Sequence, residues 1–337
     1  MRAPTVLLLT WMVVSCGDAA TKPGGGSAGA GASGGAGSSG GAAGGAGSAG
    51  AAGMPPFSGG FREGDGFDSA RLMIAGEPRA VEVYAPPGRS ASPPLLVVLH
   101  GTYGRGPEMV GPDRPRGFED LADRAGIVLA APTARELTAG DWDQHTDGEA
   151  NRTYWETQPT GDPARGLDPT RNPDLVLVRA ILAEAQRVHH TDPRRTYVIG
   201  FSNGGFFALH VAVVLRDQIA GFGEIASGLV RCENTNSCAF RGNGTSCDAL
   251  RAEPGYCSCN GAEKPAPLPV SGGMPPGYLT HSNDDDTVSV YYSCELDARM
   301  TALGHPHRVR INDRAGGHAI PEGVAQDAWA YLSQFTR

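Results

Sequence analysis

Short apolar strands that alternate with helical segments are the feature that most constrains the fold of this chain. Residues 94–100 and 196–200 are continuous apolar runs typical of buried strands, and residues 174–189 have helical periodicity with Asp174 as the expected N-cap. Further strands are expected at 79–84, 127–131, 221–226, 277–281 and 308–312, and further helices at 118–124, 206–215, 290–303 and 324–335. The alternation predicts an α/β fold with a mostly parallel, doubly wound sheet and helices on both of its faces.

The first 56 residues lie outside this pattern. A short apolar run after Arg2 ends at Cys16, as in the signal peptide of a bacterial lipoprotein. We expect residues 1–15 to be the signal peptide and Cys16 to be lipidated; the alternative is an ordinary signal peptide with an incidental cysteine. Residues 24–53 are only Gly, Ala and Ser, which bury too little to offset their ordering entropy. Residues 16–56 are therefore predicted to be a flexible tether, and residues 57–337 the folded domain.

The signal peptide and the lipidated cysteine predict an exported protein. It would be anchored to a membrane through its lipid, in the periplasm or at the cell surface, or released outside the cell. The net charge of −8 and the absence of a basic run argue against a nucleic-acid partner.

Cysteines are concentrated late in the chain. Besides Cys16 there are six of them: Cys232, Cys238, Cys247, Cys257, Cys259 and Cys294. An even number in an exported chain indicates three disulfides, with Cys257 and Cys259 expected to take different partners. Five of the six lie in residues 231–260, which we interpret as a disulfide-rich insertion over the edge or mouth of the sheet. A zinc cluster is the alternative, but the spacing fits no common zinc pattern.

Ser202 is the candidate nucleophile, in the motif G-F-S-N-G of residues 200–204. The pattern alone is weak, because the tether matches it at Ser27, Ser33 and Ser39. Only Ser202 follows an apolar strand and precedes a helix, and that arrangement lifts a serine above the sheet on a sharp turn. The N–H groups at the start of the helix would then face the negative charge that develops in the reaction. The alternative is an ordinary serine in a glycine-rich turn.

A serine hydroxyl needs an oriented base, and in this arrangement the partners follow in the order Ser, acid, His. His318 lies in a loop between a strand and the final helix and is the predicted base; His305 and His307 are expected to be structural or exposed. The acid falls in residues 281–288, H-S-N-D-D-D-T-V, where three adjacent aspartates leave the choice open. This run lacks the Gly and Glu that an EF-hand loop requires, and we expect neither a metal nor a cofactor.

The oxyanion hole needs a second N–H donor besides that of Asn203. The turn H-G-T-Y-G at residues 100–104 follows an apolar strand, and we expect Thr102 to donate, with Tyr103 as second choice. His100 is expected to stabilise the turn. In the loop of residues 140–155, aromatic side chains either line a substrate pocket or pack in the core, and the sequence leaves both open for Trp142, Tyr154 and Trp155.

Four segments in the same order resemble polyhydroxybutyrate depolymerases and feruloyl-esterase-like members of the α/β-hydrolases. Residues 192–205 resemble their nucleophile region, residues 99–104 their oxyanion turn, residues 281–288 their H-G-x-x-D-x-x-V acid loop and residues 316–321 their G-H-x-W-P histidine loop. The match spans roughly residues 72–335 and implies the α/β-hydrolase fold. By position it implies Asp285 as the acid, with Asp286 in reserve. Ser282 and Ile320 depart from the family's usual glycine and tryptophan, which bears on the substrate and not on the type of reaction.

Together these features predict an exported serine carboxylic-ester hydrolase. Ser202 would attack the ester, with His318 as base, Asp285 as the orienting acid, and the N–H groups of Asn203 and Thr102 as oxyanion donors. The substrate would be a small or oligomeric ester of short-chain, hydroxyalkanoate, feruloyl or carbohydrate-linked type. One alternative is a serine peptidase of the same fold, which usually carries a large gating domain for which we expect no room here. The other is a non-catalytic lipoprotein that binds at a surface.

Overall fold

The structure is a computed structural model that describes residues 58–111, 117–137, 152–157, 163–230, 238–258, 273–312 and 316–337. The chain divides into two compact units, residues 1–50 and 51–337, and all described residues belong to the second. The predicted signal peptide, the tether, Cys16, Trp142, Cys232 and Cys259 lie outside the described residues. Across the described ranges, none of the helices combines the length and the apolar character needed to cross a membrane.

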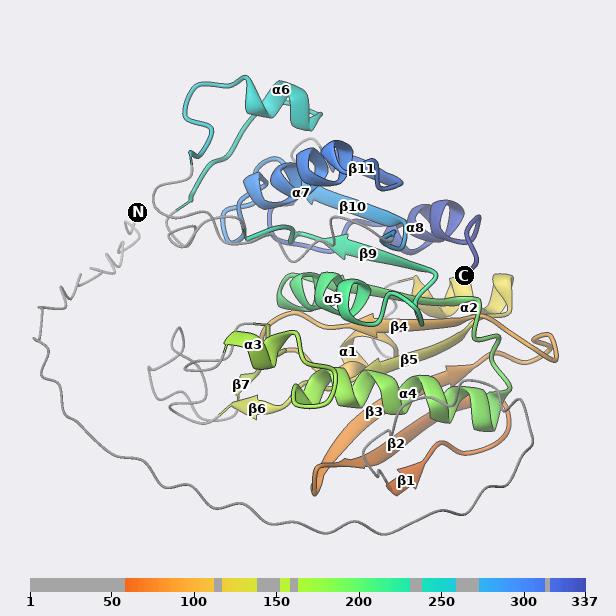
Figure 1. The fold of residues 1–337 in the computed structure, drawn as a ribbon. Helices are drawn as coiled ribbons and strands as arrows, with labels where there is room; N and C mark the ends of the chain where they lie inside the picture. The colour runs from red at the N-terminus through yellow and green to blue at the C-terminus, as the bar shows by residue number, and fades with distance from the viewer. Residues whose placement is uncertain are drawn as a thin grey trace, which may run out of the picture. The chain divides into compact units, whose positions relative to one another are not determined.

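A nine-stranded sheet forms the centre of the second unit (Figure 1), in the order β1-β2-β3-β5-β4-β8-β9-β10-β11. Its first strands are antiparallel, and β5, β4 and β8 to β11 run parallel to one another. The strands are β1 (Ser58–Gly60), β2 (Gly66–Ile74), β3 (Glu77–Ala85), β4 (Leu95–Leu99), β5 (Val128–Pro132), β8 (Thr196–Phe201), β9 (Gly221–Ile225), β10 (Gly277–Ser282) and β11 (His307–Asn312).

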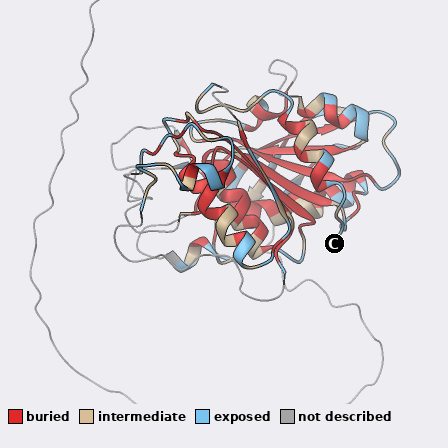
Figure 2. Ribbon diagram, turned by 90° about the horizontal axis from the view of Figure 1, so that it is seen from above, coloured by how far each residue is buried: buried red, intermediate tan, exposed pale blue. Residues whose placement is uncertain are grey.

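Helices cover both faces of the sheet, as the alternation of strands and helices predicted. One face packs against α4 (Pro173–His189), α5 (Asn203–Val214) and α7 (Tyr291–Ala302). The other face packs against α1 (Gly106–Met109), α2 (Phe118–Ala125) and α8 (Val324–Leu332). Figure 2 shows the strands buried between these layers. The remaining elements are short: β6 (Glu136–Leu137), β7 (Arg152–Thr153), α3 (Pro163–Gly166) and α6 (Cys247–Arg251).

The parallel strands set the position of the functional residues. Strands β4 and β8 pair in the middle of the sheet, and apart from Thr196 their residues are apolar and almost all buried, as is typical of strands covered on both faces. In a parallel sheet the carboxyl ends of the strands meet at one edge, where open α/β sheets bind their ligands. The segments that follow β4, β8 and β10 carry the predicted oxyanion turn, nucleophile and acid.

Strand β2 and the N-cap of α4 are two places where the structure differs from the expectation. Strand β2 was not predicted; it alternates buried and exposed residues and forms a hairpin with β3 through Ala75 and Gly76, both at positive φ. The N-cap of α4 is Asn172, whose Oδ1 accepts hydrogen bonds from the N–H groups of Asp174 and Leu175 at 2.9 and 3.2 Å. The prediction of Asp174 as the N-cap was wrong. Pro173, which lacks an N–H, occupies the first helical position, and the cap is therefore the residue before it.

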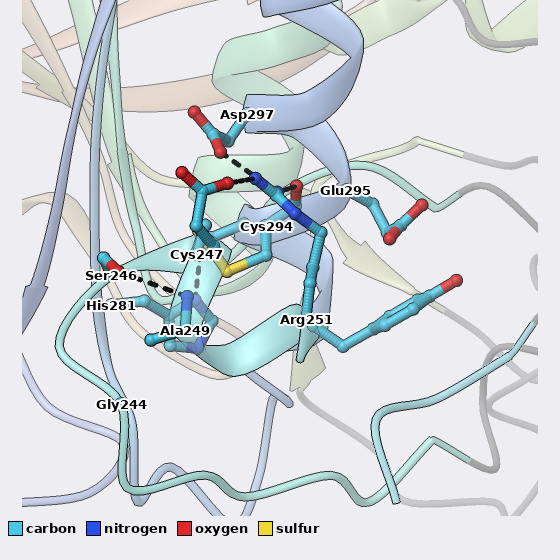
Figure 3. Close-up of a disulfide and its surroundings, with 12 residues drawn as sticks. Gly244, Ser246, Cys247, Ala249, Arg251, His281, Cys294, Glu295 and Asp297 are labelled. Atoms are coloured by element: carbon cyan, nitrogen blue, oxygen red, sulfur yellow. Dashed lines mark hydrogen bonds and ion pairs between the residues drawn. A yellow bond between two sulfur atoms is a disulfide. The ribbon is translucent and has the colours of Figure 1, made fainter. Parts of the chain in front are cut away.

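Residues 238–258, called the Cys lobe below, pack against α7. Disulfides join Cys238 to Cys257 and Cys247 to Cys294, the second of which links the lobe to the helix. Arg251 donates from Nη1 to the Cys294 carbonyl at 2.8 Å and lies 3.1 Å from Asp297 (Figure 3). The disulfides confirm the prediction for these four cysteines and exclude them as zinc ligands. The described residues contain no cluster of three or more His, Cys, Asp or Glu side chains that could hold a metal ion.

Candidate active site

Ser202 lies on the sharp turn between β8 and α5. Its backbone has φ 55° and ψ −123°, a strained conformation for a residue other than glycine. The turn is tight enough to require the flanking glycines: a Cβ on Gly200 would lie 2.0 Å from the Gly204 carbonyl oxygen, and one on Gly204 would lie 2.4 Å from that of His100. This is the geometry that lifts a serine hydroxyl above the end of a sheet.

His318 joins Ser202 to Asp285. Its Nε2 lies 2.9 Å from Ser202 Oγ, and its Nδ1 lies 2.8 Å from Asp285 Oδ2. Because a carboxylate only accepts hydrogen bonds, it holds a proton on Nδ1 and leaves Nε2 free to act as a base. The ring of Phe201 lies 4.8 Å from the imidazole and limits how it can turn. The structure thus brings together all three residues of the predicted triad.

Asp285 is held from several sides. Its Oδ1 accepts hydrogen bonds from the N–H groups of Thr287 and Val288, both at 2.9 Å, and His281 Nε2 lies 3.3 Å from its Oδ2. Burial alone would raise the pKa of Asp285, but the hydrogen bonds from His281, His318 and the Val288 N–H outweigh burial and hold the pKa well below its usual range. The carboxylate therefore stays ionised at neutral pH.

The structure distinguishes the three adjacent aspartates. Asp284 Oδ1 accepts from the Gly317 N–H at 3.3 Å, which ties the acid loop to the histidine loop. The side chain of Asp286 is 59% exposed and lies 3.8 Å from Arg241. Of the three carboxylates, the one in contact with His318 is that of Asp285.

The loop that carries the acid is braced by His281 and by the Cys lobe. His281 lies 2.7 Å from Ser293 Oγ through Nδ1 and 2.8 Å from the Val288 carbonyl through Nε2. The N–H of Gly242 donates to the Asn283 carbonyl at 3.1 Å, and Ser289 Oγ donates to the Phe240 carbonyl at 2.8 Å; Asn283 Nδ2 also donates to the Gly244 carbonyl. Sequence reasoning placed the insertion at the edge or mouth of the sheet but did not predict these contacts.

The predicted oxyanion turn lies against Ser202, since a Cβ on Gly101 would be 3.2 Å from Ser202 Cβ. The N–H of Tyr103 donates to the Thr153 carbonyl at 2.9 Å and is therefore occupied. The N–H groups of Thr102 and Asn203 donate to no acceptor within the described part of the chain. The geometry thus favours Thr102 over Tyr103 as the partner of Asn203.

His100 has the structural role expected of it. Its Nε2 accepts a hydrogen bond from the Ala134 N–H at 2.9 Å, and its Nδ1 lies 2.6 Å from the Gly101 carbonyl. Burial lowers the pKa of His100 to about 4, so the ring is neutral at neutral pH. It therefore holds the turn between β4 and α1.

Residues 152–157 link the oxyanion turn after β4 to the nucleophile turn after β8, a role that the sequence did not predict. Trp155 donates from its backbone N–H to Asn203 Oδ1 at 2.7 Å and from Nε1 to the His100 carbonyl at 2.8 Å. Its ring is fully buried and stacks on Phe207 at 5.2 Å, so Trp155 is a packing residue and not part of a pocket wall. Tyr154 is half-buried and its pKa is raised by burial, while its side chain hydrogen-bonds that of Asn203.

Three curated proteins share sequence with this chain, and no family model matches it. NocK of Nocardia uniformis subsp. tsuyamanensis, which is named an esterase, is 33% identical over 47% of this chain and 40% of its own length. The bifunctional acetylxylan esterase/xylanase XynS20E of Neocallimastix patriciarum is 24% identical over 77% of this chain and 34% of its own. Poly(3-hydroxyalkanoate) depolymerase C of Paucimonas lemoignei is 24% identical over 67% and 52%. The chain therefore spans 34 to 52% of the length of these relatives.

Solved structures resemble the fold more completely. The acetyl xylan esterase from Aspergillus awamori aligns with a TM-score of 0.51 over 83% of this chain and 99% of its own, at 14% identity. So low an identity shows the fold alone. The chain has the α/β-hydrolase fold. The sequence relatives confirm the resemblance to esterases and polyhydroxyalkanoate depolymerases that the four motifs indicated.

Proposed function

We propose that this protein is an exported serine hydrolase of carboxylic esters. The observation that carries the proposal is the continuous line of hydrogen bonds from Asp285 through His318 to Ser202. A serine at a nucleophile turn, linked to an imidazole whose orientation a buried carboxylate fixes, is the arrangement that activates a hydroxyl for acyl transfer. The names of the sequence relatives support an ester as the substrate.

The reaction has two steps. His318 Nε2 takes the proton of Ser202 as Oγ attacks the ester carbonyl, and the N–H groups of Thr102 and Asn203 stabilise the oxyanion that forms. His318 then gives its proton to the leaving alkoxide, and an acyl-enzyme remains on Ser202. A water molecule, deprotonated by the same nitrogen, releases the acid and restores the serine. Asp285 stays ionised throughout and stabilises the imidazolium that forms in each step.

The substrate and the location of the protein belong to the same proposal. Short-chain, hydroxyalkanoate and feruloyl or carbohydrate-linked esters are the substrates we propose, supported by the acetylxylan esterase and depolymerase names of two relatives. Two disulfides support an oxidising compartment and hence export. A lipid on Cys16 as the membrane anchor remains part of the proposal.

Labelling with a fluorophosphonate, followed by peptide mapping, tests the nucleophile without knowledge of the substrate. We expect one adduct, on Ser202, and a fall in kcat of about 10⁴ or more for p-nitrophenyl acetate in Ser202→Ala. The matched control is Ser333→Ala, at an exposed position just after α8, which should label and turn over like the wild type. No adduct on folded protein would favour the non-catalytic binding alternative. Cleavage of peptides in preference to esters would favour the peptidase.

A further inference from the structure

Tyr103 has a backbone conformation that residues with bulky side chains rarely adopt. It is the third residue of the turn closed by the hydrogen bond from the Gly104 N–H to the Gly101 carbonyl at 3.0 Å. Its φ is +66°, in the left-handed region that glycine or asparagine adopts readily at this position of a turn. A bulky aromatic residue there is an outlier, because its Cβ crowds the backbone.

Thr153 prevents the turn from relaxing. Its carbonyl accepts the Tyr103 N–H at 2.9 Å, and its Oγ1 donates to the Gly104 carbonyl at 2.6 Å. A flip of the peptide between Thr102 and Tyr103 would relieve the strain but would break the first of these bonds. The surrounding structure therefore imposes the conformation, as is common where backbone strain serves a function.

The ring of Tyr103 lies largely outside the core. The residue is 48% exposed, and it is one of three large hydrophobic residues of the described chain that are exposed; the other two are Phe67 and Leu167. Tyr103 differs from those two in its position, next to the proposed oxyanion donor Thr102 and two residues after Gly101, which lies against Ser202. Backbone strain that the surroundings impose on an exposed residue is common where that residue contacts a ligand, and Tyr103 is exposed beside the proposed oxyanion turn.

We propose that Tyr103 is a substrate-contacting residue whose ring packs on a flat, ring-shaped group of the ester. This inference rests on the proposed function and deepens it. A tyrosine offers a rigid apolar face at low conformational cost, and such a face binds an aryl ring or the apolar face of a sugar. Its place beside the oxyanion turn would align such an ester for attack by Ser202.

The test compares Tyr103→Asn, which removes the ring but tolerates a positive φ, with Tyr103→Phe, which keeps the ring. For each variant, kcat and KM are measured with methyl ferulate, with an acetylated xylo-oligosaccharide and with ethyl acetate, which has no ring. In Tyr103→Asn we expect kcat/KM for at least one of the ring-bearing esters to fall about 10-fold or more relative to ethyl acetate, mainly through KM. Tyr103→Phe should keep the wild-type ratio. The ester whose ratio falls identifies the ring as aryl or sugar.

Relief of strain gives a second readout. Tyr103→Asn should melt a few degrees above the wild type, because asparagine fits the left-handed conformation. An equal loss on all three esters would indicate a purely structural role and overturn the proposal, as would wild-type selectivity in Tyr103→Asn.

The proposal can also be decided if the proposed function fails. In that case the wild type would hydrolyse none of the esters, and equilibrium binding of methyl ferulate and of the xylo-oligosaccharide would replace kinetics. Loss of binding in Tyr103→Asn but not in Tyr103→Phe would support the contact. Equal binding in both variants, or no binding to the wild type, would overturn it.

Discussion

Glu224, in the middle of β9, should make the stability of this protein depend on pH. Its side chain is fully buried, and neither carboxylate oxygen has a hydrogen-bond partner within the described ranges. Burial raises the pKa of Glu224 well above the ordinary value of 4.5. The group is therefore held as the neutral acid in the folded protein, whereas it ionises normally once the chain unfolds.

The sign and size of the effect follow from proton linkage. Above pH 4.5 the unfolded chain has lost the proton that the native Glu224 keeps, so the native state binds one proton more. The free energy of unfolding then falls by about 1.4 kcal/mol for each pH unit, up to the pKa of the folded state. Glu224→Gln has a similar shape and no titrating proton. The free energy of unfolding of the variant minus that of the wild type should therefore increase with this slope above pH 4.5.

Glu184 offers a matched control with the opposite sign. It is also buried, but hydrogen bonds from Arg187 at 2.6 and 2.8 Å, the largest influence, lower its pKa against the opposing effect of burial. The Phe61 N–H donates to it as well, at 2.9 Å. Its contribution to stability is present above pH 4.5 and is lost as the pH falls through the folded pKa. Glu184→Gln should therefore destabilise the protein at neutral pH and converge on the wild type in acid.

Urea unfolding of the three proteins at steps from about pH 3 to about pH 8, with the disulfides intact, measures both differences. Opposite trends with pH are expected for the two variants. A difference between Glu224→Gln and wild type that does not change with pH would refute the reasoning. So would a trend of the same sign for both glutamates.

Two further predictions concern the acid and the disulfides. Asp285→Asn should lower kcat by about 10⁴, because an amide can stabilise the wrong tautomer of His318, while Asp286→Asn should change kcat by less than about 3-fold in the same esterase assay. Loss of the Cys247–Cys294 bridge by a double substitution to Ala should lower the free energy of unfolding in urea by about 4 kcal/mol, because that bridge closes a long loop. The Cys238–Cys257 bridge, with a separation of 19 against 47 residues, should contribute about 3 kcal/mol, and the reverse order would contradict the loop-closure reasoning.

The parts of the fold that the sequence predicted are those with strong local signals. Strand β8 and helix α5 are mostly apolar, and Gly200 near the end of the strand and Gly204 near the start of the helix are required by contacts within the turn itself. Strand β2 was missed because Asp68 lies at one of its buried positions and Phe67 at an exposed one, which interrupts the apolar alternation. The sequence of β2 alone does not distinguish a strand from a polar loop; its pairing with β3 does.

In the active site, too, the residues with a strong local sequence pattern were predicted and the others were not. Ser202 and His318 follow from a strand, a helix and the order of the triad, whereas three adjacent aspartates could be separated only by resemblance and then by contact with His318. The hydrogen bonds of Trp155 join residues 48 and 55 positions apart in the chain, at Asn203 and at His100. Hydrogen bonds between residues so far apart in the chain leave no local pattern, and so the contacts of Trp155 could not be predicted.

His281 illustrates the contacts that only the structure reveals, and it leads to the last prediction. Its Nε2 lies 2.8 Å from the Val288 carbonyl and 3.3 Å from Asp285 Oδ2, so one ring touches both the acid and the peptide that follows it. His281→Asn is too short to keep both contacts, and we expect kcat to fall about 10-fold with little change in KM. Loss of this hydrogen bond should also raise the pKa of Asp285 toward its usual range.

The control for this prediction is His307→Asn. That ring also bonds a carboxylate, Asp297 at 3.0 Å, but on α7 and outside the acid loop, so kcat should change by less than about 3-fold. Equal losses in the two variants would mean that His281 supports the fold and not the acid. A rise in KM at constant kcat in His281→Asn would place its effect on the substrate. A selective loss of kcat would show that the acid of the triad depends on a second histidine to hold its position.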